Sequence, residues 1–228
     1  MRSRIVGFIL VLLTFISCGN KEELERLISG NIELENDIQQ MESDLKMTDK
    51  NEAKITFLVN QMKGVKARII TNYGNIEVKF FPELAPIHCY SFILRAESGF
   101  YDNTLFHRVM PGFMIQGGDP NSKNNDPYDD GSGGPLVAMP HEFNSKKHVP
   151  GILSMARVGD KSAGAGSQFF IMHGTTPNLD GDYTVFGQVT KGMDVVNKIA
   201  AVETEKQNPR LKDRPVKPVK IQKMEVYR

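Results

Sequence analysis

The stretch from Phe106 to Asp119 constrains the fold of this chain more than any other, because proline and glycine repeatedly interrupt its large apolar residues. Pro111 and Gly112 divide it in the middle and two further glycines precede its last residue, which breaks the run too often for a helix. Its apolar residues alternate too poorly for a strand with one face in solvent. We therefore predict two short strands joined by a tight turn.

The predicted hairpin places one cationic residue, Arg108, among large apolar residues and follows them with a polar amide, Gln116. The apolar neighbours are Phe106, Val109, Met110, Phe113, Met114 and Ile115. Arginine keeps its positive charge at physiological pH, donates hydrogen bonds and does not act as a base. We therefore expect a guanidinium donor at the edge of an apolar pocket.

The rest of the chain after Gly64 predicts many short strands and few helices. Strands are expected at Val65–Thr71, Asn75–Phe80, Gly151–Ala156, Ser167–Met172, Val185–Val189 and Val219–Val226. Amphipathic helices are expected at Ala85–Glu97, which Pro86 opens, and at Met193–Ala200, and a polar loop at 119–135. This content is typical of a closed antiparallel barrel, and about 165 residues are enough for one hydrophobic core.

Three further blocks accompany the hairpin, at residues 151–157, 166–172 and 178–187. Together with residues 106–119 they resemble, in order and spacing, the signature of the cyclophilins, the cyclosporin-binding class of peptidyl-prolyl isomerases. The resemblance runs from about Val65 to Arg228, and several agreeing blocks are more specific than one short motif. It implies a mainly β fold, a closed eight-stranded antiparallel barrel capped by two α-helices, and isomerase activity without a cofactor.

The resemblance also implies the roles of individual residues. Arg108 and Gln116 match catalytic positions, and substrate-binding positions are matched by Phe113, Met114, Ala156, Arg157, Gln168, Phe170, Leu179 and Tyr183. Many family members carry Asn where this chain has Arg157 and His where it has Tyr183, and drug-sensitive members carry Trp where it has Asn178. For the apolar residues of this set, packing in the core is the alternative interpretation.

Other chemistries find little support in the sequence. The five histidines show no metal-ligand pairing on a predicted helix, no Gly-x-Ser-x-Gly elbow is present, and no Gly-Lys-Ser/Thr follows the glycines at 164–166. A guanidinium, two amides and an apolar pocket fit prolyl isomerisation, which needs neither nucleophile nor metal. Two alternatives stay open: a module that binds proline-containing segments, and a structural surface lipoprotein with the same fold.

Residues 1–18 predict a lipoprotein signal peptide. Arg2 and Arg4 precede an apolar run of 12 residues from Ile5 to Ile16, which is shorter than the roughly 20 residues that span a membrane. The sequence from Phe15 to Cys18 resembles a bacterial lipobox, in which the cysteine is lipidated. A plain secretory signal cut near Ser17 or Cys18 is the alternative. The lipobox predicts a protein anchored to a bacterial membrane, facing the periplasm or the cell surface.

Residues 19–63 differ from the rest in charge and periodicity. The segment holds six Lys/Arg and ten Asp/Glu residues and no proline, and nine of its twelve heptad core positions between Leu24 and Met62 are apolar. This pattern predicts a helical stalk and, through residues 24–62, a possible coiled-coil homodimer. A solvated spacer helix is the alternative.

The whole chain of 228 residues has a net charge of +1, so its charge does not indicate binding to nucleic acid. The resemblance implies proline-containing polypeptides as the substrates, and the lipobox predicts a membrane, through Cys18, as the second partner. Cys89, amid apolar residues, is expected to pack in the core.

Overall fold

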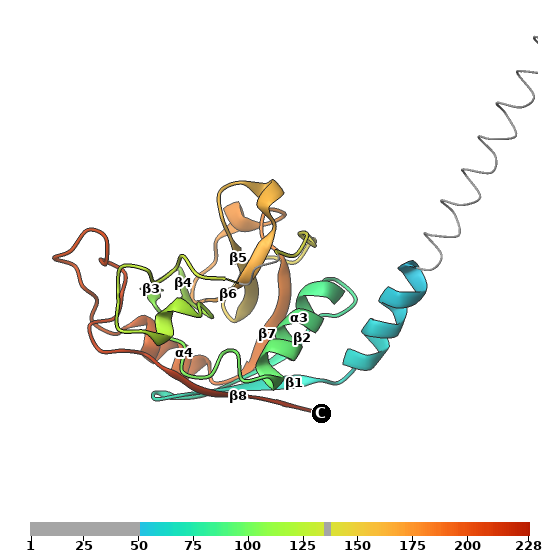
Figure 1. The fold of residues 1–228 in the computed structure, drawn as a ribbon, viewed down its shortest axis with the longest axis horizontal. Coiled ribbons are helices and arrows are strands. Elements are labelled where there is room, and N and C mark those ends of the chain that lie inside the picture. Colours follow the sequence, from blue (N-terminus) through green and yellow to red (C-terminus); the bar gives the residue numbers. More distant parts are fainter. Residues whose placement is uncertain (1–50, 135–137) are drawn as a thin grey trace, which may run out of the picture. The chain divides into compact units, whose positions relative to one another are not determined.

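The computed structural model describes residues 51–134 and 138–228 (Figure 1). Residues 55–228 form one compact unit. Residues 51–62 are helical, whereas the predicted signal peptide and residues 19–50 of the predicted stalk lie outside the described residues. None of the helices in the described ranges is both long and apolar enough to cross a membrane.

The first two predicted strands are present and form a hairpin of their own. β1 (Lys66–Thr71) and β2 (Gly74–Phe80) pair antiparallel, and every second residue of each strand is buried. Strand side chains alternate between the two faces of a sheet, so Ala67, Ile69 and Thr71 reach the interior while their neighbours remain more exposed. The Thr71 hydroxyl closes the turn by donating to the Gly74 carbonyl over 2.7 Å.

Two α-helices cover the sheet, as predicted. α3 (Pro86–Glu97) starts with proline, which lacks only an N–H that a first helical turn leaves unpaired anyway. The carboxylate of Glu142 accepts the next two backbone N–H groups, from Ile87 and His88, both over 2.9 Å, and so satisfies the positive end of the helix dipole. α4 (Met193–Ala200) follows Gly192, whose φ of +90° favours glycine.

The remaining strands complete one curled antiparallel sheet. They are β3 (Arg108–Met110), β4 (Met114–Gly117), β5 (Ile152–Arg157), β6 (Ala165–Met172), β7 (Val185–Lys191) and β8 (Ile221–Tyr227). The eight strands run in the order β3-β4-β6-β5-β7-β2-β1-β8. Short 3₁₀ turns at 121–123, 161–163 and 177–179 lie in the connections.

The sheet is open, so the prediction of a closed barrel is wrong in this respect. β3 and β8 are its two ends, and among the described residues the segments beside them share one isolated bridge, Leu105 to Lys220, instead of a ladder. Next to that bridge, the N–H of Asn103 donates to the carbonyl of Ile221 over 2.8 Å. Beyond that bridge, the N–H of Val109 on β3 donates to the carbonyl of Asp213, which lies in the loop before β8. Pro215 and Pro218 in that loop have no N–H with which to extend the pairing.

The two faces of the strands near the hairpin build two hydrophobic clusters. The main core includes Val109, Ile115 and Phe169, together with Phe92 of α3 and Cys89, which is fully buried as expected. Burial raises the pKa of the Cys89 thiol, and its Sγ lies 3.2 Å from the Phe186 carbonyl. The alternating residues of β4 and β6 point to the other face, where Met114, Phe170 and Met172 form a smaller cluster with Ile152 of β5 and Val185 of β7.

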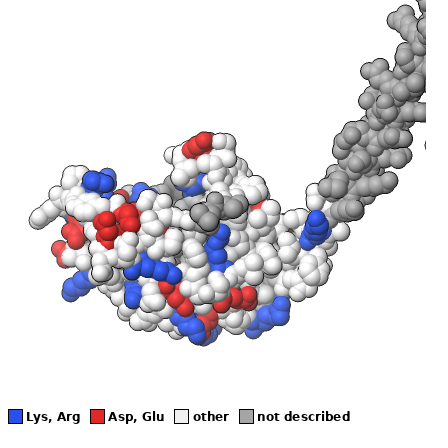
Figure 2. All heavy atoms as spheres, in the orientation of Figure 1, with Lys and Arg blue, Asp and Glu red and all other residues white. Residues whose placement is uncertain are grey.

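The charged side chains do not separate by sign on the face drawn in Figure 2, where blue and red patches are interspersed. This distribution agrees with the near-zero net charge of the chain.

Candidate active site

The predicted hairpin is present and brings Arg108 directly opposite Gln116. β3 and β4 pair antiparallel with Arg108 against Gln116 and Met110 against Met114. The turn between them contains Gly112 at a φ of +77°, a conformation that suits glycine. Residues directly opposite each other in an antiparallel pair point to the same face, and the guanidinium Nη1 of Arg108 donates to Oε1 of Gln116 over 3.4 Å.

Two further contacts hold the Arg108 guanidinium. Its Nε lies 3.5 Å from Oδ2 of Asp213, and its Nη2 lies 3.2 Å from the sulfur of Met110. The side chain remains 43% exposed, so the guanidinium is oriented but still open to a ligand. Sequence reasoning missed Asp213, which lies 105 residues further along the chain and outside every signature block.

A chain of amide hydrogen bonds fixes Gln116 in turn. Its Nε2 donates to Oε1 of Gln168 over 2.9 Å, and Nε2 of Gln168 donates to the carbonyls of Gly131 and Gly133 over 2.9 and 2.7 Å. Gln168 therefore links the hairpin to the loop that follows it, and it orients the predicted catalytic amide.

Asp119, at the end of the signature stretch, organises the same loop. Its carboxylate is fully buried and accepts the backbone N–H groups of Asn121 over 2.8 Å, Gly133 over 3.2 Å and also Gly131. Because a buried carboxylate needs such donors, Asp119 anchors the loop against the site. A lone carboxylate directly after Gly117-Gly118 was the available sequence signal, and sequence reasoning did not use it.

A cavity of about 180 Å³, lined by apolar side chains together with three polar ones, opens beside the guanidinium. Nine of the ten residues predicted for the site line it: Arg108, Phe113, Met114, Gln116, Ala156, Arg157, Phe170, Leu179 and Tyr183. The tenth, Gln168, contacts it through Gln116. Strand register explains the convergence, because Arg108, Gln116 and Phe170 lie opposite one another across β3, β4 and β6.

Arg157 and Tyr183, the two cavity residues that differ from those of many family members, contact each other. The guanidinium of Arg157 lies over the ring of Tyr183, 4.6 Å from its centroid, which is the arrangement of a cation–π pair. Arg157 also donates from Nε to the Asp182 carbonyl over 2.8 Å and from Nη1 to the Val158 carbonyl over 2.9 Å. Its charge is therefore engaged with the wall of the cavity. Asn178 lies in the neighbouring 3₁₀ turn, and unlike Leu179 it does not line this cavity.

A buried polar network supports the cavity from beneath. His148 Nδ1 lies 3.0 Å from Oδ1 of Asp180, and His148 Nε2 lies 3.1 Å from Oγ of Ser154. Hydrogen bonds from the backbone and ring of His148 lower the pKa of Asp180 to about 2, whereas burial lowers the pKa of His148. His148 stacks on Phe170 at 6.1 Å.

This network resembles a Ser-His-Asp triad in composition only. Both Ser154 and His148 are fully or almost fully buried, at 0% and 1% exposure, so no substrate carbonyl could reach the hydroxyl. The Ser154 hydroxyl instead donates to the carbonyl of Thr184 over 3.0 Å. Sequence reasoning did not pair His148 with Asp180 because 32 residues separate them.

Among residues 51–134 and 138–228, no three His, Cys, Asp or Glu side chains gather in a way that could hold a metal ion. His107, which directly precedes Arg108, is buried at 6% exposure, and that burial lowers its pKa.

Known proteins resemble the chain over most of the compact unit formed by residues 55–228. The sequence model of the family described as "Cyclophilin type peptidyl-prolyl cis-trans isomerase/CLD" matches residues 66–226. A protein of Rhizopus delemar named "Peptidyl-prolyl cis-trans isomerase-like 2" is 40% identical over 166 residues, which cover 71% of this chain and 28% of that protein. A protein of Neurospora crassa named "Peptidyl-prolyl cis-trans isomerase-like 1" is 39% identical over 164 residues, which cover 69% of this chain and 91% of that protein.

The longer relatives and the solved structures add two facts. The chain spans only about a quarter of the length of several curated relatives, at 28%, 25% and 22%. A crystal structure of a Cryptosporidium parvum cyclophilin-type isomerase, determined in the presence of the dipeptide Ala-Pro, matches with a TM-score of 0.64 at 33% identity, and the match covers 72% of this chain and 99% of that one. The chain therefore belongs to the cyclophilin-type peptidyl-prolyl cis-trans isomerase family.

Proposed function

We propose that the chain catalyses cis–trans rotation about X-Pro peptide bonds of polypeptides. The observation that carries this proposal is the position of the Arg108 guanidinium, held by Gln116 and Asp213 beside an apolar cavity. The named relatives support it, and the Ala-Pro dipeptide present with the Cryptosporidium protein supports a proline-containing substrate.

The reaction places few demands on the protein. Its barrier, about 18–20 kcal/mol, arises from amide resonance, which is lost when the bond twists and the proline nitrogen becomes pyramidal and basic. A donor aimed at that nitrogen binds the twisted state better than either planar state and so lowers the barrier. Arginine has five N–H groups, and the described contacts of Arg108 use three of them. The others remain for the substrate.

The cavity would also contribute to binding the twisted state of the X-Pro bond better than the planar states. Phe113, Met114, Phe170 and Leu179 would surround the proline ring and exclude water, which strengthens the hydrogen bond from the guanidinium. Gln116 would contact the substrate backbone and keep Arg108 in position. This mechanism uses no covalent intermediate, so no nucleophile is required.

Exchange spectroscopy by NMR on a short Ala-Pro peptide tests the proposal. The purified protein at a small fraction of the peptide concentration should bring cis–trans exchange from the uncatalysed scale of tens of seconds to below a second. Heat-denatured protein is the control. Saturable peptide binding without faster exchange would contradict catalysis and favour the module that only binds proline-containing segments.

We further propose that the protein works in the cell envelope of a bacterium, where it assists the folding of exported proteins. The support is the sequence of residues 1–18, with its basic start, short apolar run and Cys18. Acyl chains on Cys18 would anchor it, because each buried methylene adds about 0.8 kcal/mol. Cys18→Ser should move the protein from the membrane to the soluble fraction. Retention on membranes after a high-salt wash would refute the anchor.

We also propose that residues 24–62 pair two copies of the chain in a coiled coil. The apolar heptad positions from Leu24 to Met62 support this. Sedimentation of Cys18→Ser protein with and without residues 19–54 should show a dimer and a monomer, respectively. A monomeric mass for both proteins would leave the segment as a spacer.

A further inference from the structure

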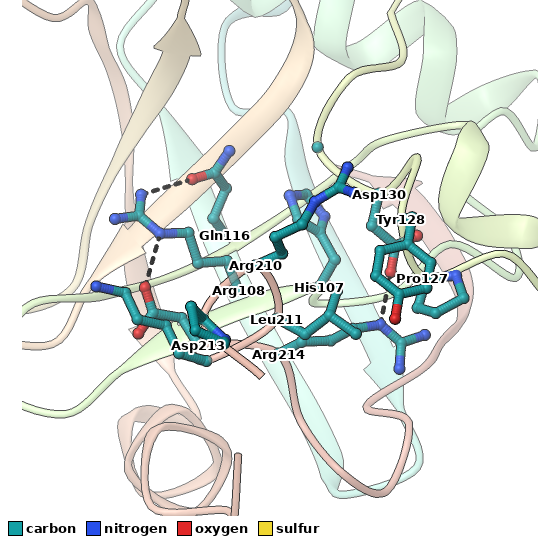
Figure 3. Close-up of a pocket in the computed structure, with 13 residues that line it drawn as sticks. His107, Arg108, Gln116, Pro127, Tyr128, Asp130, Arg210, Leu211, Asp213 and Arg214 are labelled. Carbon is teal, nitrogen blue, oxygen red and sulfur yellow. Dashed lines mark hydrogen bonds and ion pairs between the residues drawn. The ribbon is translucent and has the colours of Figure 1, made fainter. Parts of the chain in front are cut away.

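A second cavity, of about 290 Å³, adjoins the proline cavity, and Arg108 and Gln116 line both. Its remaining walls are His107 and two loops, residues 127–131 and residues 209–214. Figure 3 shows Arg108 and Gln116 on one side, Tyr128 and Asp130 on the other, and Arg210 between them. A polypeptide whose proline occupies the first cavity therefore has this second cavity within reach of its neighbouring residues, which are spaced about 3.3–3.6 Å apart when extended.

The charge of the second cavity is predominantly positive. Four cationic side chains line it, Arg108, Arg210, Lys212 and Arg214, against two carboxylates, Asp130 and Asp213.

The two carboxylates are already engaged. Asp213 contacts Arg108 at 3.5 Å and Asp130 contacts Arg214 at 2.8 Å, as the dashed lines of Figure 3 mark. In the part of the chain that the structure describes, no carboxylate lies within ion-pairing distance of Arg210 or Lys212, and both residues are exposed. The cavity therefore presents two cations that have no anionic partner among the described residues.

The walls that carry these cations are held in place. Arg210 lies over the Tyr128 ring, 5.1 Å from its centroid, and the Tyr128 hydroxyl lies 3.2 Å from Nδ2 of Asn208. Beside them, the carbonyl of Asp213 accepts the N–H of Val109 over 2.8 Å, which attaches this loop to β3. A guanidinium stacked on a ring keeps its donor edge free, and that edge matches the two oxygens of a carboxylate.

We infer that the second cavity binds an acidic side chain of the substrate, so that the protein prefers proline-containing segments with Asp or Glu within two residues of the proline. This inference rests on the proposed function, because it extends the same site. Arg210 and Lys212 are the specificity residues, and Arg108 remains the catalytic donor shared by both cavities.

Matched peptides test the inference. One set carries Glu two residues before or two residues after the proline of an Ala-Pro core, and its control set carries Gln at the same positions. Both kcat/KM, from NMR exchange, and the dissociation constant, from fluorescence anisotropy of labelled peptides, are measured. We expect at least one Glu peptide to show about three- to tenfold higher kcat/KM and tighter binding than its Gln partner, as two exposed ion pairs would produce.

Two variants assign the effect to its residues. The double substitution Arg210→Gln and Lys212→Gln should bring the Glu-to-Gln ratio to about one, and added salt should lower the ratio of the unmodified protein because exposed charges are screened. Lys217→Gln removes an exposed cation outside the cavity and should leave the ratio unchanged. Melting curves confirm that each variant is folded.

Each outcome separates the two proposals. Equal constants for Glu and Gln peptides, or a preference that survives the double substitution, overturn the acidic subsite while turnover of the Gln peptides upholds the isomerase. Absence of turnover on every peptide overturns the isomerase, yet tighter binding of a Glu peptide that the double substitution abolishes would still establish the subsite.

Discussion

Arg108→Ala is the substitution that tests the site most directly. It removes the guanidinium from a cavity whose other predicted residues stay in place, and it leaves Gln116 and Asp213 at the surface of the site without their shared partner. Loss of a positioned donor that stabilises a transition state costs about 10²–10³-fold in rate, or about 2.7–4 kcal/mol. We therefore expect kcat/KM on a short Ala-Pro peptide to fall by that factor.

The same substitution should change stability little. The Arg108 side chain is 43% exposed and its ion pair with Asp213 is 3.5 Å long, and such exposed pairs contribute about 0.2–1 kcal/mol. For a domain of this size that corresponds to a loss of at most about 4 °C in Tm. Arg68→Ala is the matched control, because Arg68 is 36% exposed and pairs with Glu77 and Glu225 far from the cavity. It should lower Tm similarly and leave turnover unchanged.

Arg108→Lys separates charge from geometry. Lysine keeps the positive charge, but its single ammonium cannot contact Gln116 and Asp213 and also donate to the proline nitrogen in the fixed geometry of a guanidinium. We expect more than about tenfold loss of kcat/KM. Near-unchanged turnover of Arg108→Ala, with a folded protein by melting curve, would refute the mechanism. Full activity of Arg108→Lys alone would show that charge is sufficient.

Three further predictions concern the support of the site. Phe170→Ala should destabilise the protein by about 3–5 kcal/mol in urea unfolding, because Phe170 is 4% exposed and packs under the cavity; a loss below about 1 kcal/mol would contradict that packing. Gly118→Ala should cost about 1–3 kcal/mol, since Gly118 has a φ of +82° and a Cβ there would meet the Ser167 carbonyl at 2.8 Å; an unchanged urea midpoint would disprove the strain. Stability should fall on acidification, because the folded pKa values of His148 and of Asp180, the latter about 2, lie below their ordinary values and the unfolded chain then binds more protons. Urea midpoints measured from pH 7 downward should therefore decline, and Asp180→Asn should flatten the decline below about pH 4; equal slopes would exclude Asp180 as its source.

The location of the candidate site followed from local sequence. Pro111 and Gly112 limit the backbone so strongly that a hairpin is the only element that suits the stretch from Phe106 to Asp119. Once that hairpin exists, period-two alternation puts Arg108 and Gln116 on one face. The signature blocks then identified the apolar residues that line the cavity, and the structure brings nine of the ten predicted residues together there.

Contacts between distant segments were decided by the tertiary structure alone. Asp213 reaches Arg108 across 105 residues, and His148 reaches Asp180 across 32. No local periodicity encodes such pairs, because they depend on the paths of the loops between them. The openness of the sheet has the same origin: strand patterns predicted eight strands, but closure depended on which N–H groups the loop before β8 could offer to β3. That loop contains Pro215 and Pro218, and its Asp213 carbonyl accepts the N–H of Val109. The two ends of the sheet are therefore joined by one bridge and a few separate hydrogen bonds instead of by a continuous ladder.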